Sequence, residues 1–127
     1  SAAGEIKEVI DQMRSKGEKV GLLKIRSFRP FPYAQIAQAL SRAKIVTVLD
    51  RSASFGAHGP VFVEINTAVY NYSANRPLLL GQTYGLGGRE LTLRHIEHII
   101  GESRLCLDKG AVGDRQGRWI NVRGDKQ

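Results

Sequence analysis

The spacing of hydrophobic positions changes several times along the chain, and each change indicates a new element. Residues 5–16 carry apolar side chains at helical spacing, and Gly17 follows where a left-handed cap would end a helix. The next run, KVGLLKI at 19–25, is short and apolar, as in a buried strand. The beginning of the chain is therefore predicted to be a helix followed by a strand.

A second helix is predicted to begin at Pro32, because the fixed φ of proline suits a first helical turn. Its apolar stripe consists of Ile36, Ala39, Leu40 and Ala43. Residues 44–50 are β-branched and almost wholly apolar, which indicates a central strand covered on both faces.

The run 61–72 is ambiguous, because its first residues alternate as they would in a strand. Helical spacing of later apolar residues favours a helix; these are Ile65, Ala68, Val69 and Tyr72. Residues 77–85 then predict another strand. A final helix is expected over 92–103, with Thr92 as its N-cap.

Alternating helices and strands are typical of an α/β fold, in which helical crossovers join parallel strands. We predict one α/β domain over residues 1–104. Residues 105–127 are glycine-rich and mostly polar, and are expected to form a polar C-terminal tail or a small hairpin. Such a domain normally begins with a strand, so we expect this chain to be part of a longer one.

The length and the composition of the chain exclude some classes of protein function. The length of 127 residues suits one domain, and no apolar run approaches the roughly 20 residues that span a bilayer, so no membrane partner is expected. Cys106 is the only cysteine, which excludes an internal disulfide and a cysteine-held iron–sulfur cluster within the chain. A single free thiol suits a cytoplasmic protein.

The formal net charge of +7 raises nucleic acid as a partner. The cations are spread along the chain with acidic residues between them, so a nucleic-acid interface is not favoured. A basic face that meets an acidic protein fits equally well.

Four segments carry candidate chemistry, and each has a simpler structural explanation. The glycine-rich GLGGRE at 85–90 precedes a helix, where backbone N–H groups can bind phosphate, but Glu90 replaces the third glycine of the dinucleotide motif. A tight turn is therefore favoured. His95 and His98 share a helix, yet two histidines are too few for a zinc site, and helix-surface residues are the expectation.

The segment DRSASFGAHG at 50–59 leaves the carboxyl end of a central strand, which is where α/β sheets bind ligands and partners. Asp50, Arg51 and His58 are its candidate contact residues. The alternative is that Asp50 only caps nearby N–H groups. In KIRSFRPFP at 24–32, the phenylalanines are expected to fill the core, which leaves the arginines unexplained.

Three stretches, taken together and in this order, resemble a known family. They are KVGLLKIRSFRPFP, IVTVLDRSASFGAHGPVFVEI and YGLGGRELT. They are similar to the C-terminal domain of the alpha subunit of pyruvate and related 2-oxoacid:ferredoxin oxidoreductases, and the resemblance covers residues 5 to about 101. It implies a fold similar to the transketolase C-terminal domain, a three-layer α/β/α sandwich around a mostly parallel mixed sheet.

The resemblance also implies a role. The family's complexes convert a 2-oxoacid and coenzyme A to acyl-coenzyme A and carbon dioxide, and pass electrons to ferredoxin. Thiamine diphosphate, Mg²⁺ and iron–sulfur clusters carry that chemistry. This chain has neither cluster cysteines nor a thiamine diphosphate motif. We therefore expect a non-catalytic, cytoplasmic assembly domain, inactive alone, that binds no cofactor itself and contacts other domains and the beta, gamma and delta subunits.

The expected subunit or substrate contacts are Arg26, Arg29, Asp50, Arg51, His58 and Arg89. One alternative is a free-standing basic α/β module that binds an anionic ligand or nucleic acid. Another is the C-terminal domain of a different thiamine-dependent enzyme, such as a 2-oxoacid dehydrogenase beta subunit or deoxyxylulose phosphate synthase. The residues of the RSFRPFP and GLGGRE motifs favour the oxidoreductase family over these alternatives.

Overall fold

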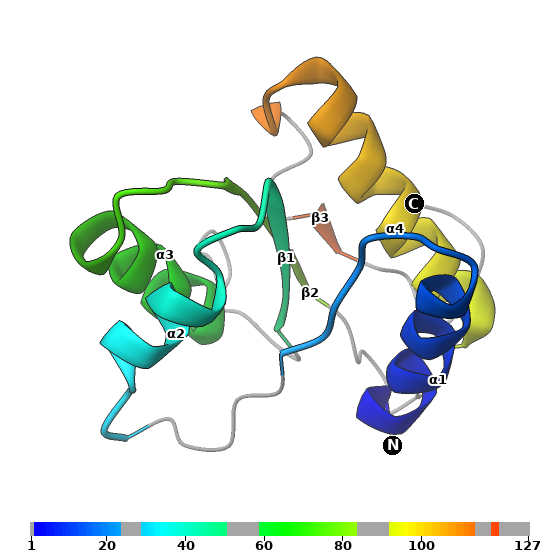
Figure 1. Ribbon diagram of the computed structural model, residues 1–127, viewed down its shortest axis with the longest axis horizontal. Helices are drawn as coiled ribbons and strands as arrows, with labels where there is room; N and C mark the ends of the chain where they lie inside the picture. The colour runs from blue at the N-terminus through cyan, green and yellow to red at the C-terminus, as the bar shows by residue number, and fades with distance from the viewer. Residues whose placement is uncertain (1, 24–28, 51–58, 84–91, 114–117, 120–127) are drawn as a thin grey trace.

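The computed structural model describes residues 2–23, 29–50, 59–83, 92–113 and 118–119. Its elements, in chain order, are α1 (Ala2–Ser15), α2 (Tyr33–Ala39), β1 (Ile45–Asp50), α3 (Pro60–Tyr72), β2 (Leu78–Thr83), α4 (Leu93–Lys109) and β3 (Arg118–Trp119). Figure 1 shows the three strands at the centre of the molecule.

The sheet has the strand order β1-β2-β3, and both pairings are parallel. Strands β1 and β2 pair along their full length, from Ile45 opposite Leu78 to Asp50 opposite Thr83. Strand β3 pairs only with the last two residues of β2, Gln82 and Thr83. Asp50 and Thr83 therefore end neighbouring strands at one edge of the sheet, its carboxyl edge.

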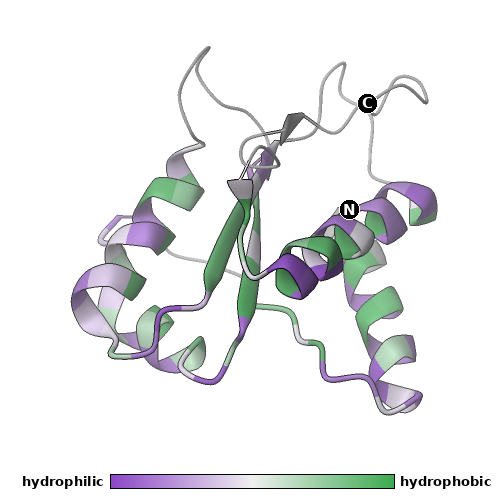
Figure 2. Ribbon diagram, turned by 90° about the horizontal axis from the view of Figure 1, so that it is seen from above, coloured by the Kyte–Doolittle hydropathy of each residue, from purple (hydrophilic) through white to green (hydrophobic). Residues whose placement is uncertain are grey.

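Helices cover both faces of this sheet (Figures 1 and 2). Helices α2 and α3 pack together on one side, where α3 contacts β1, and α1 packs on α4 on the other side, where α4 contacts β1 and β2. The α/β class predicted from the sequence is confirmed. The fuller sandwich of the transketolase C-terminal domain, with its mixed sheet, stays a prediction, because the strands described are three and all pair in parallel.

Two hydrophobic clusters follow from the alternation of side chains along β1. Val46 and Val48 point to one face and pack with α2, α3 and Phe31. Leu49 points to the other face and packs with Ile96 and Ile99 of α4, which also meet α1. Figure 2 shows the strands coloured hydrophobic between the flanking helices.

Several sequence predictions agree with these elements. Pro32 is the residue before α2, Thr92 is the N-cap of α4, and the ambiguous run 61–72 is helical from Pro60 to Tyr72. Phe31 is buried in the core as expected, with 7% of its surface exposed. Phe28 lies outside the described residues.

Two predictions about local structure are wrong. Residues 19–23 were expected to form a strand, but they have no strand conformation, and Leu22 and Leu23 are each 43% exposed. A strand needs a neighbouring strand to supply hydrogen bonds, and no described strand pairs with residues 19–23. Residues 24 and 25 lie outside the described part.

The second error concerns the end of the chain. Helix α4 continues to Lys109 and ends at Gly110, which adopts the left-handed conformation with φ of 75°. Residues 105–109 are therefore helical and not a tail. Arg118 and Trp119 join the sheet in parallel with β2. The predicted hairpin falls mainly on residues outside the described part, so it stays a prediction. The proposed boundary between a domain and a tail stays a prediction.

Gly81 allows α3 to approach the sheet closely. A Cβ atom added there would lie 2.7 Å from Cδ1 of Phe62, a buried residue of α3. We expect Gly81→Ala to lower the free energy of unfolding by about 1–3 kcal/mol, as overpacked core substitutions do. Urea unfolding followed by circular dichroism measures this change.

Gly101 supplies the matched control, because it lies on the exposed side of α4 and a Cβ atom there would meet nothing within 4 Å. Gly101→Ala should raise the stability by about 0.5–1 kcal/mol through helix propensity alone. Equal effects of the two substitutions would contradict the packing argument.

Candidate functional site at the carboxyl edge of the sheet

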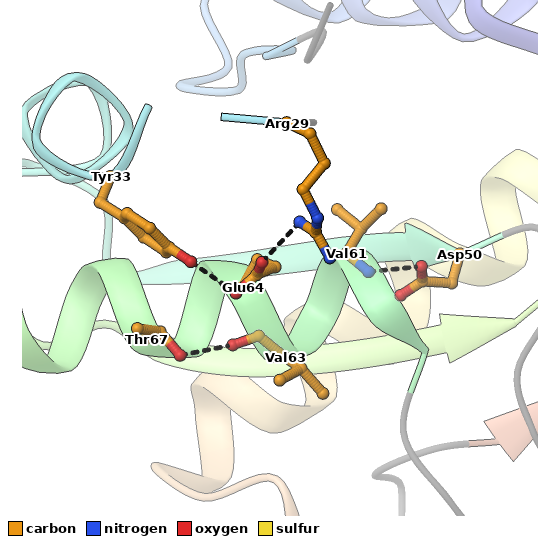
Figure 3. Close-up of polar contacts among 7 residues, drawn as sticks. All are labelled: Arg29, Tyr33, Asp50, Val61, Val63, Glu64 and Thr67. Carbon is orange, nitrogen blue, oxygen red and sulfur yellow. Dashed lines mark hydrogen bonds and ion pairs between the residues drawn. The ribbon is translucent and has the colours of Figure 1, made fainter. Parts of the chain in front are cut away.

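Asp50 is the last residue of β1 and is buried, with only 3% of its surface exposed. Its Oδ1 accepts a hydrogen bond from the backbone N–H of Val61 at 2.9 Å, and its Oδ2 accepts one from Phe62 at 3.0 Å. Figure 3 shows the carboxylate against the beginning of α3. Buried carboxylates require such partners, and both oxygens have one.

Asp50 acts as the cap that α3 lacks locally. The N-cap residue of α3 is Gly59, which has no side chain to accept a hydrogen bond, and Pro60 follows at the first position of the helix. A Cβ atom at Gly59 would collide with the Asp50 side chain. Glycine at position 59 therefore lets the strand residue reach the N–H groups of the helix from 11 residues away in sequence.

This arrangement bears on the two roles that the sequence suggested for Asp50, a cap and a partner contact. The carboxylate neutralises the positive end of the α3 dipole and uses its first available N–H donors. An incoming anion would meet a negative charge at that position. The geometry thus supports the capping role, and direct contact of Asp50 with a partner stays a prediction.

Arg29 contacts α3 in a second place. Its Nη1 donates to Oε2 of Glu64 at 2.9 Å, while the hydroxyl of Tyr33 donates to Oε1 of the same carboxylate at 2.9 Å (Figure 3). The Glu64 side chain is 17% exposed and that of Arg29 is 69% exposed. Glu64 therefore joins α3 to α2 and to the segment before it, and the sequence reading that Arg29 lacks a partner within the chain is wrong.

Aromatic contacts extend this junction. The ring centroids of Phe31 and Tyr33 are 5.0 Å apart, and Tyr33 stacks on Tyr72 at the end of α3 with a centroid distance of 5.6 Å. Such pairs add roughly 0.5–1.5 kcal/mol beyond the burial of their area. Tyr33 is thus fixed by its hydroxyl at Glu64 and by its ring at Tyr72.

The carboxylate of Glu64 raises the pKa of Tyr33 above its ordinary value. The main cause is the hydrogen bond that the phenol donates to Glu64, with smaller contributions from burial and from the negative charge itself. The nearby Arg29 acts in the opposite direction. The net effect favours the protonated phenol.

The N-terminus of α4 is capped by residues that adjoin or belong to the helix itself. The Thr92 hydroxyl accepts from the His95 N–H at 3.2 Å, and Nδ1 of His95 accepts from the Thr92 N–H at 3.0 Å. This is a capping box in which histidine takes the position where glutamate or glutamine is usual. His95 therefore has a structural role, and His98 is half-buried on the same helix.

Gln82 lies in the sheet near Asp50, with 2% of its surface exposed. Its Oε1 is buried and has no hydrogen-bond partner among the residues that the structure describes. Leaving an acceptor unpaired in this way costs about 1–3 kcal/mol. Alternation along β2 directs Gln82 to the same side as Leu80, away from the α3 side that Gly81 faces.

The structure brings two of the predicted site residues, Arg29 and Asp50, to the same helix, at different points of α3. The other four lie outside the described residues: Arg26, Arg51, His58 and Arg89. Sequence reasoning missed Glu64, although it is the only charged residue between Pro60 and Tyr72, and a lone charge in an apolar helix signals a specific partner.

Within the described ranges, no group of three His, Cys, Asp or Glu side chains is arranged to hold a metal ion. Cys106 is a free thiol with 0% exposure. Over the same residues, none of the helices has the length and apolar character needed to cross a bilayer.

Comparison with known proteins identifies the family to which the chain belongs. Residues 1–96 match the family model for the pyruvate:ferredoxin oxidoreductase core domain II. The chain belongs to this family. This match confirms the resemblance inferred from the sequence. The Asp50 cap and the contacts of Glu64 both lie within the matched residues 1–96.

Curated relatives agree with the assignment. Ketoisovalerate oxidoreductase subunit VorA of Pyrococcus furiosus is 38% identical over 123 residues, which cover 97% of this chain and 31% of that protein. Pyruvate synthase subunit PorA of Methanosarcina barkeri is 40% identical over 117 residues, covering 91% and 29%. The PorA subunit of Thermotoga maritima is 40% identical over 123 residues, covering 97% and 30%. The chain thus spans less than a third of the length of these relatives.

Removal of the Asp50 carboxylate should weaken the junction between β1 and α3. We expect Asp50→Ala to cost about 1–3 kcal/mol of unfolding free energy, because two N–H groups lose their acceptors. Asp50→Asn keeps one acceptor oxygen and should cost less. Asp11→Asn, in an exposed pair with Lys7, should change stability by less than about 1 kcal/mol. A tolerated Asp50→Ala would disprove the capping role.

Glu64 should control the titration of Tyr33. Replacement by glutamine removes the negative charge, so the pKa of Tyr33 should fall toward about 10. Because folding raises this pKa, the unfolded chain loses the proton first, and the stabilising contribution present below pH 10 should disappear as the pH rises further. Ultraviolet absorbance of the phenolate, corrected with Tyr33→Phe, reports the pKa.

Glu97→Gln, on the exposed side of α4, is the control and should leave the Tyr33 titration unchanged. If both variants titrate like the parent chain, the hydrogen bond to Glu64 does not determine the acidity of Tyr33.

Proposed function

We propose that the chain is a non-catalytic assembly domain in the alpha subunit of a thiamine diphosphate-dependent 2-oxoacid:ferredoxin oxidoreductase. The complex would convert a 2-oxoacid and coenzyme A to acyl-coenzyme A and carbon dioxide, with the electrons passing to ferredoxin. The family match supports the enzyme class. The relatives named for pyruvate and for ketoisovalerate support a 2-oxoacid as the substrate class, and both kinds of name occur among them.

One observation carries the non-catalytic role. The titratable side chains described near the carboxyl edge are already used in structural hydrogen bonds, and Gln82, whose Oε1 has no partner among the described residues, is an amide that cannot act as an acid or base. Asp50 caps α3, Thr92 and His95 cap α4, and Glu64 is shared by Arg29 and Tyr33. A general acid or base must be able to reach a substrate proton, whereas the Asp50 carboxylate is buried and has a donor on each oxygen.

In this proposal the chain itself binds none of the cofactors of such complexes. An iron–sulfur cluster needs several thiolates, and the single cysteine, Cys106, is fully buried. The positive end of α3, which could otherwise face a diphosphate, is occupied by a carboxylate. Thiamine diphosphate, Mg²⁺ and the clusters are therefore assigned to other parts of the complex.

The partners in this proposal are the remaining domains of the alpha subunit and the beta, gamma and delta subunits, in a cytoplasmic complex. Coenzyme A and ferredoxin would be reached through that complex. Arg29 is the described contact residue with an accessible charge, and Arg26, Arg51, His58 and Arg89 remain proposed contacts. Asp50 would support these contacts by holding the base of the segment that contains Arg51 and His58.

The test compares the isolated chain with the assembled enzyme. We expect the isolated chain to show no oxidation of pyruvate with ferredoxin and no thiamine diphosphate binding by calorimetry. An affinity tag on the subunit that contains it should retain a thiamine-binding subunit when salt is raised.

Micromolar binding of thiamine diphosphate to the isolated chain would refute the non-catalytic assignment. Affinity for RNA or DNA that falls steeply with salt, without co-purifying subunits, would favour a basic binding module instead.

A further inference from the structure

The outward face of α3 differs from the outward faces of the other long helices. It consists of Pro60, Val63, Asn66, Thr67, Tyr70 and Asn71, and none of these residues is charged. Val63 is 47% exposed and Tyr70 is 65% exposed. A helix packed on a core by one face normally carries charged residues on the other face. The outward sides of α1 and α4 carry charged residues, among them Lys7, Asp11, Arg94, Glu97 and Arg104, although α4 also exposes Leu93, Leu105 and Leu107.

Two polar side chains of this face, Thr67 and Asn71, are turned back onto the helix. The Thr67 hydroxyl donates to the carbonyl oxygen of Val63 at 3.1 Å, as Figure 3 shows, and Nδ2 of Asn71 donates to the carbonyl oxygen of Thr67 at 3.0 Å. Groups that already have a partner cost less to remove from water. The α3 outer face can therefore be covered by another surface at a small desolvation cost.

Both ends of the face carry an arginine. The guanidinium of Arg76 lies 4.6 Å from the centroid of the Tyr70 ring and donates to the Tyr70 carbonyl oxygen. Near the other end, Arg29 is bound to Glu64. The side chain of Glu64 is 17% exposed against 69% for Arg29, so the charge presented to solvent there is mainly the cation. A face with an uncharged centre, an exposed tyrosine and flanking arginines has the composition of a protein interface.

We propose that the α3 outer face docks on a protein surface with an apolar centre and a carboxylate rim, in another part of the same oxidoreductase. This inference rests on the proposed function. The chain spans less than a third of the relatives' length, so in those proteins it adjoins a larger body of protein. Tyr70 is the central anchor, and Arg29 and Arg76 meet the acidic rim.

Charge disfavours a second copy of this chain as the occupant. If two α3 outer faces met in antiparallel orientation, Arg29 of one copy would approach Arg76 of the other. In parallel orientation each arginine would approach its own equivalent. The net charge of +7 on each chain adds to this repulsion. An acidic partner removes the conflict at both ends of the face.

The experiment uses the intact complex, purified through a tag on the subunit that contains this chain. A photoreactive benzoylphenylalanine replaces Tyr70, and the matched control carries it at Gln12, an exposed position on α1. We expect the probe at position 70 to cross-link one segment of another domain or subunit, rich in apolar and acidic residues. Cross-linking to a second copy of this chain, or no more cross-linking than from position 12, would overturn the proposal.

A second measurement needs no substitution. Hydroxyl-radical footprinting of the unaltered subunit should show several-fold lower modification of Tyr70 in the complex than in the separated chain. Tyr70→Ala should then weaken assembly by about 10- to 100-fold, as loss of a central interface residue does, and Gln12→Ala should leave it unchanged. Circular dichroism of the variants confirms that they fold.

These outcomes separate the two proposals. An active complex that contains the chain, but in which Tyr70 stays fully reactive, overturns the docking proposal and leaves the assembly function standing. Purification of the chain without any oxidoreductase subunit overturns both.

Discussion

The contact between the carboxylate of Asp50 and the first N–H groups of α3 is the constraint on which half of this domain depends. It fixes where the helix begins relative to the end of β1, and the register of α3 on the sheet follows from that position. Phe62 then meets Gly81, and Ile65 and Val69 enter the cluster with Val48. Helix α2 in turn packs on α3 through Glu64 and the stacked tyrosines.

The two sides of the sheet are stabilised in different ways. On the α4 side the helix caps itself, since Thr92 and His95 are three residues apart, and the helices display charged surfaces to water. On the α3 side the cap comes from a distant strand, and the outer surface is uncharged. The two sides thus differ in the charge that they present to water, although α4 also exposes the apolar side chains of Leu93, Leu105 and Leu107.

Sequence patterns correctly predicted the elements whose apolar residues are buried at a regular spacing. The spacing in 61–72 identified α3, and the β-branched run at 44–50 identified β1, because local side-chain period reflects burial directly. The pattern failed at 19–23, where an apolar run lacks a strand partner. The sequence suggested that Asp50 caps N–H groups, but it did not show which helix receives the cap. Nor did it show that Glu64 joins Arg29 to Tyr33, because partners 35 and 31 residues apart are set by tertiary packing.

The hydrogen bonds from Asp50 to Val61 and Phe62 also join the two chain positions that flank residues 51–58. Because β1 and α3 already hold these two positions close together, closing the connection between them costs little additional chain entropy. The loop-closure cost rises only slowly with length. A longer or shorter connection between Asp50 and Gly59 would therefore change the free energy of folding little, so the residue types within it can be set by what they contact.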